Sequence, residues 1–354
     1  MKLLNFPWLV IVNVIDVMEP IDLITLSMSS KRMRTYIRCQ MRRNGVMMHV
    51  EIEGPIKFYF RKNSLKPDDP EYTYHCVVVT SHDAKSRKLY RKGGEVYKYF
   101  KLSGKTQKIV YTRAFENRVH TLQTYWSDTQ HGLTDIFDYA CWLLCPRYIE
   151  VRVDLKETCF SRFVLVKWLN QHANKFNMIV FEGVKDYYGD LNYSYILDKM
   201  KNHNFVCLKM APSTSFKMEK FNGTMECLYL DQATWVDLMS VKNIKSNLIR
   251  LKHCNFNNEQ VNGFLKSLVF GPNPEFICLD IYIPEDINID EPLILDGLNA
   301  SPTTEKKSIQ IRGHEFTNCD SNQFKILGGH ECSVSIKDIV ENGVWEISIR
   351  IWRI

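Results

Sequence analysis

The sequence predicts a mixed α/β protein made of three consecutive regions that differ in their pattern of apolar residues. Residues 1–45 carry apolar side chains at helix spacing, and residues 46–148 contain β-branched and aromatic runs between turn signals. From residue 149 a short apolar strand recurs. We therefore expect an N-terminal three-helix unit (1–45), a β-rich connecting region with a terminal helix (46–148) and a C-terminal α/β stack (149–354).

Three helices are predicted for the first region. Apolar residues recur at helix spacing in its first segment: Leu9, Val10, Val14, Ile15 and Met18. Pro20 suits the first position of a second helix, and Ser29-Ser30 offers an N-cap for a third, basic one. So short a segment rarely stabilises itself through its own core. Its excess of large apolar side chains predicts a surface that another protein covers.

The middle region predicts short strands over 50–60, 72–80, 95–102 and 107–112, separated by breaks rich in proline, glycine and aspartate. A helix is expected over 131–144, where Leu133, Ile136 and Phe137 share a face and Pro146 follows the end.

The third region predicts strands over 149–155, 176–183, 205–211, 225–231, 248–256, 276–283 and 308–313, most of them followed by a segment compatible with a helix. The first six recur every 20 to 30 residues, close to the period of about 20–29 residues in leucine-rich repeats. Strands covered by helices on one side should then align in parallel. An α/β sandwich with evenly spaced strands is the alternative.

Two details support the repeat interpretation. Cys254 follows the strand at Ile249 at the position where a side chain would bond the turn leaving the strand. An Asn-capped helix should follow, with Val261, Phe264 and Leu265 on its apolar face. After Gly313 the pattern ends, and runs 332–339 and 345–352 predict two closing strands that cover the last open edge.

The charge pattern argues against a general nucleic-acid binder. The net charge is +6, and six positive residues fall in the third predicted helix with no acid between them: Lys31, Arg32, Arg34, Arg38, Arg42 and Arg43. The rest of the chain is nearly neutral, whereas nucleic-acid binders spread more basic surface. We favour a solvated or protein-facing basic stripe, with phosphate contact as the alternative.

Cysteine and hydropathy patterns indicate an intracellular chain without a membrane span. Eleven cysteines are scattered, often in apolar runs such as those around Cys76, Cys227 and Cys278, which suits buried reduced thiols. Pro7, Asn13 and Asp16 interrupt the N-terminal apolar run, so an amphipathic helix is preferred over a secretory signal. No window reaches the roughly 18 apolar residues of a membrane span.

No catalytic, cofactor or metal constellation is predicted. Gly104-Lys105-Thr106 ends like a phosphate-binding loop, but Tyr99 occupies the position of the required first glycine, so we expect a hairpin turn. Two pairs four residues apart could share a helix face as metal ligands: Cys141 with Cys145, and His203 with Cys207. Neither belongs to a larger ligand set, and buried thiols are the simpler interpretation.

The N-terminal residues resemble an F-box, most closely that of a nematode-expanded group. The motifs are Phe6-Pro7, Met18-x-Pro20, Asp22-Leu23-Ile24, Leu26-Ser27 and Ser30-Lys31-Arg32. Looser similarity to the type-two F-box-associated domain of that group follows at Tyr125-Trp126, Gly132-Leu133, 248–271, Gly328-Gly329 and Trp352. The chain departs from the general pattern at Trp8-Leu9, where many members carry an acidic residue.

The resemblance implies a substrate receptor that performs no chemistry itself. Its F-box would dock on a Skp-type adaptor within a cullin-RING ubiquitin ligase, and the remainder would hold a target protein for ubiquitination, in the cytoplasm or nucleus. The implied adaptor contacts are Pro7, Val10, Ile11, Val14, Ile15, Pro20, Leu23 and Leu26. Some of them must instead pack inside the three-helix unit. A repeat-type scaffold without a ligase, or a nucleic-acid binder led by the basic helix, are the alternatives.

Overall fold

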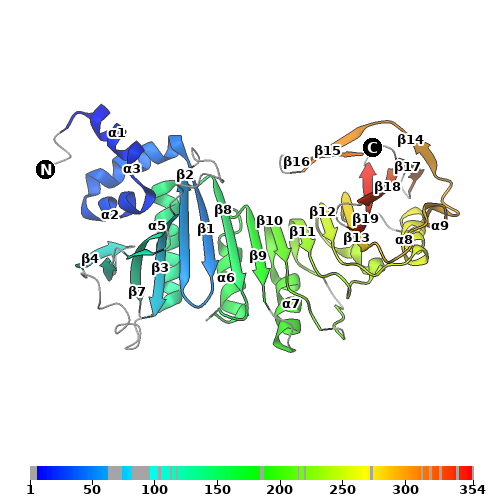
Figure 1. The fold of residues 1–354 in the computed structure, drawn as a ribbon, viewed down its shortest axis with the longest axis horizontal. Coiled ribbons are helices and arrows are strands. Elements are labelled where there is room, and N and C mark those ends of the chain that lie inside the picture. The colour runs from blue at the N-terminus through cyan, green and yellow to red at the C-terminus, as the bar shows by residue number, and fades with distance from the viewer. Residues whose placement is uncertain are drawn as a thin grey trace. The chain divides into compact units, whose positions relative to one another are not determined.

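The protein is mixed α/β and divides into two compact units, Met1–Ser161 and Arg162–Ile354 (Figure 1). The computed structural model describes residues 6–62, 74–81, 96–102, 105–111, 114–116, 119–126, 128–158, 160–183, 187–213, 215–218, 221–271, 274–311, 314–318, 321–326, 329–339 and 343–352. Among the described helices, none has both the length and the apolar character needed to cross a membrane.

Three helices open the first unit: α1 (Trp8–Val17), α2 (Pro20–Ser29) and α3 (Lys31–Asn44). Pro20 is the first residue of α2, where a missing N–H costs nothing. The Ser30 hydroxyl accepts a hydrogen bond from the backbone N–H of Met33 and caps α3. The predicted positions of the helices and of Pro20 are confirmed, and of the two candidate cap residues, Ser29 and Ser30, the structure uses Ser30.

These helices share their core with the sheet and helix that follow them in the chain. The Ser27 hydroxyl of α2 lies 2.6 Å from the hydroxyl of Tyr139 in α5 (Thr129–Leu144). Helix α2 also contacts strands β2 (Ile56–Lys62), β3 (Tyr74–Ser81) and β7 (Val119–Trp126), and α3 packs on α5. Apolar side chains of the N-terminal helices are therefore buried by their own chain, as Ile15, Leu23 and Ile37 show.

The first-unit sheet is mixed in direction. Strand β1 pairs antiparallel with β2 and parallel with β8; β2 pairs antiparallel with β3, and β3 parallel with β7. β5 and β6 pair antiparallel with β7, and β4 with β5. The strands are β1 (Val46–Ile52), β2 (Ile56–Lys62), β3 (Tyr74–Ser81), β4 (Val96–Leu102), β5 (Lys105–Tyr111), β6 (Ala114–Glu116), β7 (Val119–Trp126) and β8 (Tyr148–Asp154).

Two sequence expectations concern this sheet. Leu102 of β4 pairs with Lys105 of β5, so the chain reverses there and the predicted hairpin is confirmed, although Gly104 lies outside the described residues. Strand β7 was not among the predicted strands. Its polar residues Gln123 and Thr124 are buried, and Thr124 Oγ1 donates to the carbonyl of Val78, so tertiary hydrogen bonds allow polar side chains in a buried strand.

Among the described residues of the second unit, five parallel strands run in chain order and four antiparallel strands continue the same sheet. The order is β9-β10-β11-β12-β13-β19-β18-β17-β14. The strands are β9 (Met178–Glu182), β10 (Lys201–Leu208), β11 (Thr224–Leu230), β12 (Leu248–Leu251), β13 (Cys278–Pro284), β14 (Ser301–Thr303), β17 (Ser321–Lys325), β18 (Glu331–Ile339) and β19 (Val344–Trp352). The predicted parallel alignment of β9–β13 is confirmed, and so are the closing strands, because β19 covers the edge of β13.

Helical segments join several of these strands: α6 (Arg162–Gln171), α7 (Tyr187–Lys199), the 3₁₀-helix η2 (Leu238–Asn243), α8 (Asn258–Phe270) and α9 (Glu291–Leu295). Helix α8 starts with a capping box between Asn257 and Gln260, and it buries Val261, Phe264 and Leu265 as predicted. On the strands, Leu208, Leu230 and Leu251 lie side by side in register and are completely buried.

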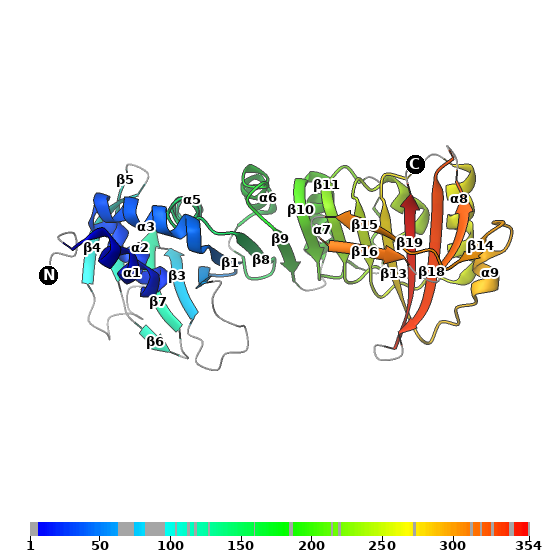
Figure 2. The ribbon, with the colours of Figure 1, turned by 90° about the horizontal axis from the view of Figure 1, so that it is seen from above.

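One predicted strand takes a different place. Run 308–313 was expected to continue the recurring strands, but β15 (Lys307–Ile311) pairs only with β16 (His314–Asn318) in a separate two-stranded sheet. The edge of β13 is already occupied by β19. Exposed Ser308 and Gln310 also give β15 one polar face, which an internal parallel strand cannot carry. Ile311 instead packs against Cys227, Leu248 and Cys278 on the open face of the strands, which Figure 2 shows from above.

Candidate docking surfaces

Helix α1 carries an exposed apolar face. Leu9 is 70% and Val17 77% exposed, and Val10 and Trp8 are exposed on the same helix. On the opposite face Ile11 and Ile15 are buried. Leu9, Val10 and Val17 are spaced so that they share one side of the helix. Apolar residues on both faces of a surface helix indicate that the outer face is available to a partner.

The exposed large apolar residues of the described chain are concentrated in the segment that contains α1. Of eleven exposed large apolar residues among those described, five belong to segment 6–17: Phe6, Trp8, Leu9, Val10 and Val17. The others are spread over the remaining elements, where single exposed apolar residues are ordinary. We call residues Leu9, Val10 and Val17 the α1 face.

The structure separates the eight implied adaptor contacts into core and surface. Pro7 and Val10 are exposed, and Val14 and Leu26 are half-buried. The remaining four are buried in the first unit: Ile11, Ile15, Pro20 and Leu23. Sequence reasoning missed Leu9, Val17 and Phe6 as surface candidates. The available signal for Leu9 and Val17 was their position on the side of the helix opposite Ile11 and Ile15.

The basic residues of α3 are partly engaged within the first unit. The Arg38 guanidinium lies 4.6 Å from the centre of the Trp142 ring, and that of Arg34 lies 5.7 Å from the Tyr139 ring, both on α5. Arg34 Nε also donates to the carbonyl of Ser27. These cation–π contacts direct part of the basic stripe onto α5 rather than into solvent.

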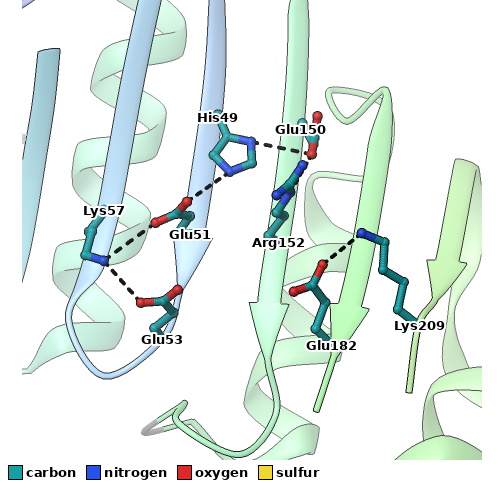
Figure 3. A network of polar contacts seen from close by, with 8 residues as sticks. All are labelled: His49, Glu51, Glu53, Lys57, Glu150, Arg152, Glu182 and Lys209. Carbon is teal, nitrogen blue, oxygen red and sulfur yellow. Dashed lines mark hydrogen bonds and ion pairs between the residues drawn. The ribbon is translucent and has the colours of Figure 1, made fainter. Parts of the chain in front are cut away.

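The exposed face of the first-unit sheet carries paired charges (Figure 3). His49 lies 3.4 Å from Glu51 and 3.6 Å from Glu150, while Lys57 Nζ is 3.1 Å from Glu53. Arg152 Nε donates to Glu150 over 2.8 Å. The hydrogen bond from His49 holds the pKa of Glu51 below its ordinary value. Because every carboxylate here has a basic neighbour, we interpret this set as a solvated sheet surface.

The second unit has a comparable surface pair in the same figure. Lys209 Nζ donates to Glu182 over 3.1 Å, and both side chains are more than two-fifths exposed. Exposed pairs of this kind contribute about 0–1 kcal/mol each. They therefore define neither a catalytic centre nor a strong structural anchor.

The two candidate metal-ligand pairs are not part of a larger ligand cluster in the described residues. Within the described part of the chain, no group of three or more potential metal ligands occurs. His203 and Cys207 lie on strand β10 and not on a helix, so four residues separate them by about 13 Å. Cys145 ends α5 with its thiol directed at the carbonyl of Trp142.

The buried cysteines have the properties of inert thiols. Burial raises the pKa of Cys207 to about 12 and that of Cys278 to about 11. All cysteines in the described segments are free of disulfides, and Cys76 and Cys227 are buried. The expectation of buried thiols at Cys76, Cys227 and Cys278 is therefore confirmed for these residues.

Comparison with known proteins gives little functional information. No protein-family model and no solved structure matches this chain. It is similar to "Uncharacterized protein F54H12.5" of Caenorhabditis elegans, with 24% identity over 352 residues that cover 96% of this chain and 90% of that protein. The similarity thus extends over nearly the full length of both chains.

Proposed function

We propose that this protein is the substrate-recognition subunit of a Skp-cullin-F-box type ubiquitin ligase. In this proposal the α1 face docks a Skp-type adaptor, and the second unit holds a target protein. The chain contributes proximity rather than chemistry, because it places target lysines where a partner enzyme transfers ubiquitin. Its place is intracellular, in the cytoplasm or the nucleus.

The observation that carries the proposal is the exposed apolar α1 face, with Leu9 and Val17 at least 70% exposed. A surface of this kind gains free energy when a partner covers it, at roughly 25 cal/mol per Å² of apolar area. The resemblance of residues 6–32 to an F-box supports an adaptor as that partner. Ile11 and Ile15 are buried on the opposite side of the same helix.

The finer layout is part of the same proposal. We assign helices α1–α3 as the F-box and strands β9–β13 as a degenerate leucine-rich-repeat-like stack within a type-two F-box-associated domain. The parallel register of β9–β13 and their spacing support the stack. Cys254 is buried just after β12, and its backbone N–H donates to the carbonyl of Tyr282 on β13. The bond from its side chain to the turn stays a prediction.

Co-purification of the full-length chain with a Skp-type adaptor tests the proposal. We expect L9D combined with V17D to abolish adaptor binding, because two buried charges would replace apolar contacts. Both residues are exposed, so these substitutions should leave folding intact. Phe270→Asp, at a residue 78% exposed on α8, is the matched control and should bind the adaptor normally.

Two results would contradict parts of this proposal. Unchanged adaptor binding by the double variant would reject the α1 face as the docking surface. No adaptor binding by the wild-type chain, together with an unchanged target half-life on its depletion, would favour a protein-interaction scaffold without a ligase.

A further inference from the structure

The open face of the second-unit sheet carries an alternation of tyrosines and basic residues. Arg250 and Lys252 come from β12 and the residue just after it, two positions apart, so they project to the same face. Tyr229 lies beside Arg250 on β11, and Tyr282 follows Asp280 on β13 on the other side. Three adjacent parallel strands thus place two cations between two aromatic rings.

The distances describe a close arrangement. Lys252 Nζ lies 5.3 Å from the centre of the Tyr229 ring and 5.9 Å from that of Tyr282. The Arg250 guanidinium carbon is 5.8 Å from each of the same ring centres. Both cations are therefore held over aromatic faces, a geometry that keeps their orientation while part of each remains accessible to solvent.

A cavity of about 430 Å³ opens over these residues. Tyr229, Arg250, Lys252, His253 and Tyr282 line it together with three apolar side chains, and the described lining contains no carboxylate. Burial raises the pKa of Tyr282 to about 12, so its hydroxyl remains a hydrogen-bond donor at neutral pH. The cavity combines positive charge, hydroxyl groups and aromatic surface.

Buried charges behind the cavity fix its basic wall. Asp280 is only 1% exposed; it lies 3.1 Å from Arg250 and 2.7 Å from Arg350. Its carboxylate also accepts a hydrogen bond from Ser348. Asp280 thereby holds Arg250 in place and offsets one of the positive charges. Lys252, in contrast, has no ion pair with any residue that the structure describes.

We propose that this cavity, the Tyr229–Tyr282 pocket, binds the carboxylate of an aspartate or glutamate in a segment of a partner protein. Lys252 forms the ion pair, the tyrosine hydroxyls donate hydrogen bonds, and the rings contact the neighbouring peptide. Arg250, Lys252 and Arg350 carry three positive charges. Asp280 and Glu346, which lies opposite Tyr282 on β19, carry two negative ones, so about one unit of positive charge remains. That balance matches a carboxylate better than a phosphate group, which carries about −1.5 to −2.

The inference rests on the proposed function, since it specifies which part of the second unit holds the target. Its test is independent of the adaptor. A phage library of random twelve-residue peptides is selected on the purified full-length chain, and the affinities of recovered peptides are measured by fluorescence anisotropy. Adaptor is absent throughout, so the L9D and V17D variant should bind the peptides as the wild type does.

We expect the recovered peptides to share an aspartate or glutamate whose replacement by asparagine or glutamine weakens binding at least tenfold. Lys252→Gln should weaken the same peptides at least tenfold, because it removes a charge-assisted hydrogen bond. Tyr229→Phe combined with Tyr282→Phe removes only the hydroxyls and should weaken them several-fold. Lys167→Gln, at an exposed lysine on α6, is the matched control and should change affinity less than twofold.

Three results would overturn the inference. These are recovery of no binding peptide, recovered peptides without a shared acidic residue, and unchanged affinity in both the Lys252 and the tyrosine variants. A phosphoserine in place of the acidic residue that binds tenfold more tightly would also overturn it, because the pocket would then be a phosphate site. If the pocket variants unfold at the same urea concentration as the wild type, a loss of peptide affinity is not caused by unfolding.

Discussion

His203 is a histidine that the fold holds in its neutral form. It is 1% exposed, and its Nε2 lies 2.8 Å from the side-chain oxygen of Asn170, whereas Nδ1 is buried without a hydrogen-bond partner. Burial lowers the pKa of His203 to about 4 from its ordinary 6.5. Protonation therefore favours the unfolded chain.

This pKa difference predicts a pH dependence of stability. Because the folded-state pKa is depressed, the unfolded chain binds the proton first as pH falls below 6.5, and stability is lost progressively down to about pH 4. The loss amounts to about 3 kcal/mol for this group. Urea unfolding at pH 7 and pH 4.5 checks it. The His203→Gln variant should lose clearly less stability than the wild type, and parallel losses in both would contradict the assignment.

At the scale of single elements, helix α8 shows how a local signal fixes a helix start. The Asn257 side chain accepts from the backbone N–H of Gln260, and the Gln260 side chain accepts from the backbone N–H of Asn257. Both interactions satisfy N–H groups that have no partner within the helix. Because such a cap depends on neighbouring residues, the sequence alone predicted the Asn257 cap, whereas the return bond from the Gln260 side chain was not predicted.

Loss of this cap should destabilise the second unit. We expect Asn257→Ala to lower the free energy of unfolding by about 1 kcal/mol, while Asn257→Asp retains most of the stability. Urea denaturation measures both. Asn255→Ala, an exposed asparagine in the same loop, serves as the control and should be neutral. Equal losses at positions 255 and 257 would show that the cap makes no specific contribution.

At the scale of the whole molecule, the N-terminal helices belong to the first compact unit and pack against its sheet and α5. Ser27 and Tyr139 join α2 to α5, Arg38 of α3 covers Trp142, and α2 contacts three strands. A fragment that ends at residue 45 loses all of these contacts. Deleting residues 1–45 would likewise uncover apolar surface on α5 and the sheet.

We therefore expect fragment 1–161 to fold and fragment 1–45 alone to remain largely unfolded. Circular dichroism with thermal melting distinguishes them: the longer fragment should give a cooperative transition, and the shorter one should not. A cooperative transition in fragment 1–45 would show that the three helices form their own core. Point substitutions on α1 are accordingly a sharper test of adaptor docking than removal of the N-terminal segment.

The sequence by itself determined the elements that depend on neighbouring residues. Pro20, the Ser29-Ser30 cap and the Asn257 cap mark helix starts, and alternating or continuous apolar runs mark most of the strands. The parallel order of β9–β13 followed from the regular recurrence of these runs. These signals are local or periodic, so a single chain displays them.

Only the tertiary structure decided which apolar residues face inward and which surfaces remain open. The resemblance to an F-box implied Ile15 as an adaptor contact and left out Val17, yet Ile15 is buried and Val17 is 77% exposed. The β15–β16 hairpin and the Tyr229–Tyr282 pocket depend on contacts between residues far apart in the chain. Burial and charge pairing arise from those distant contacts, and no local pattern encodes them.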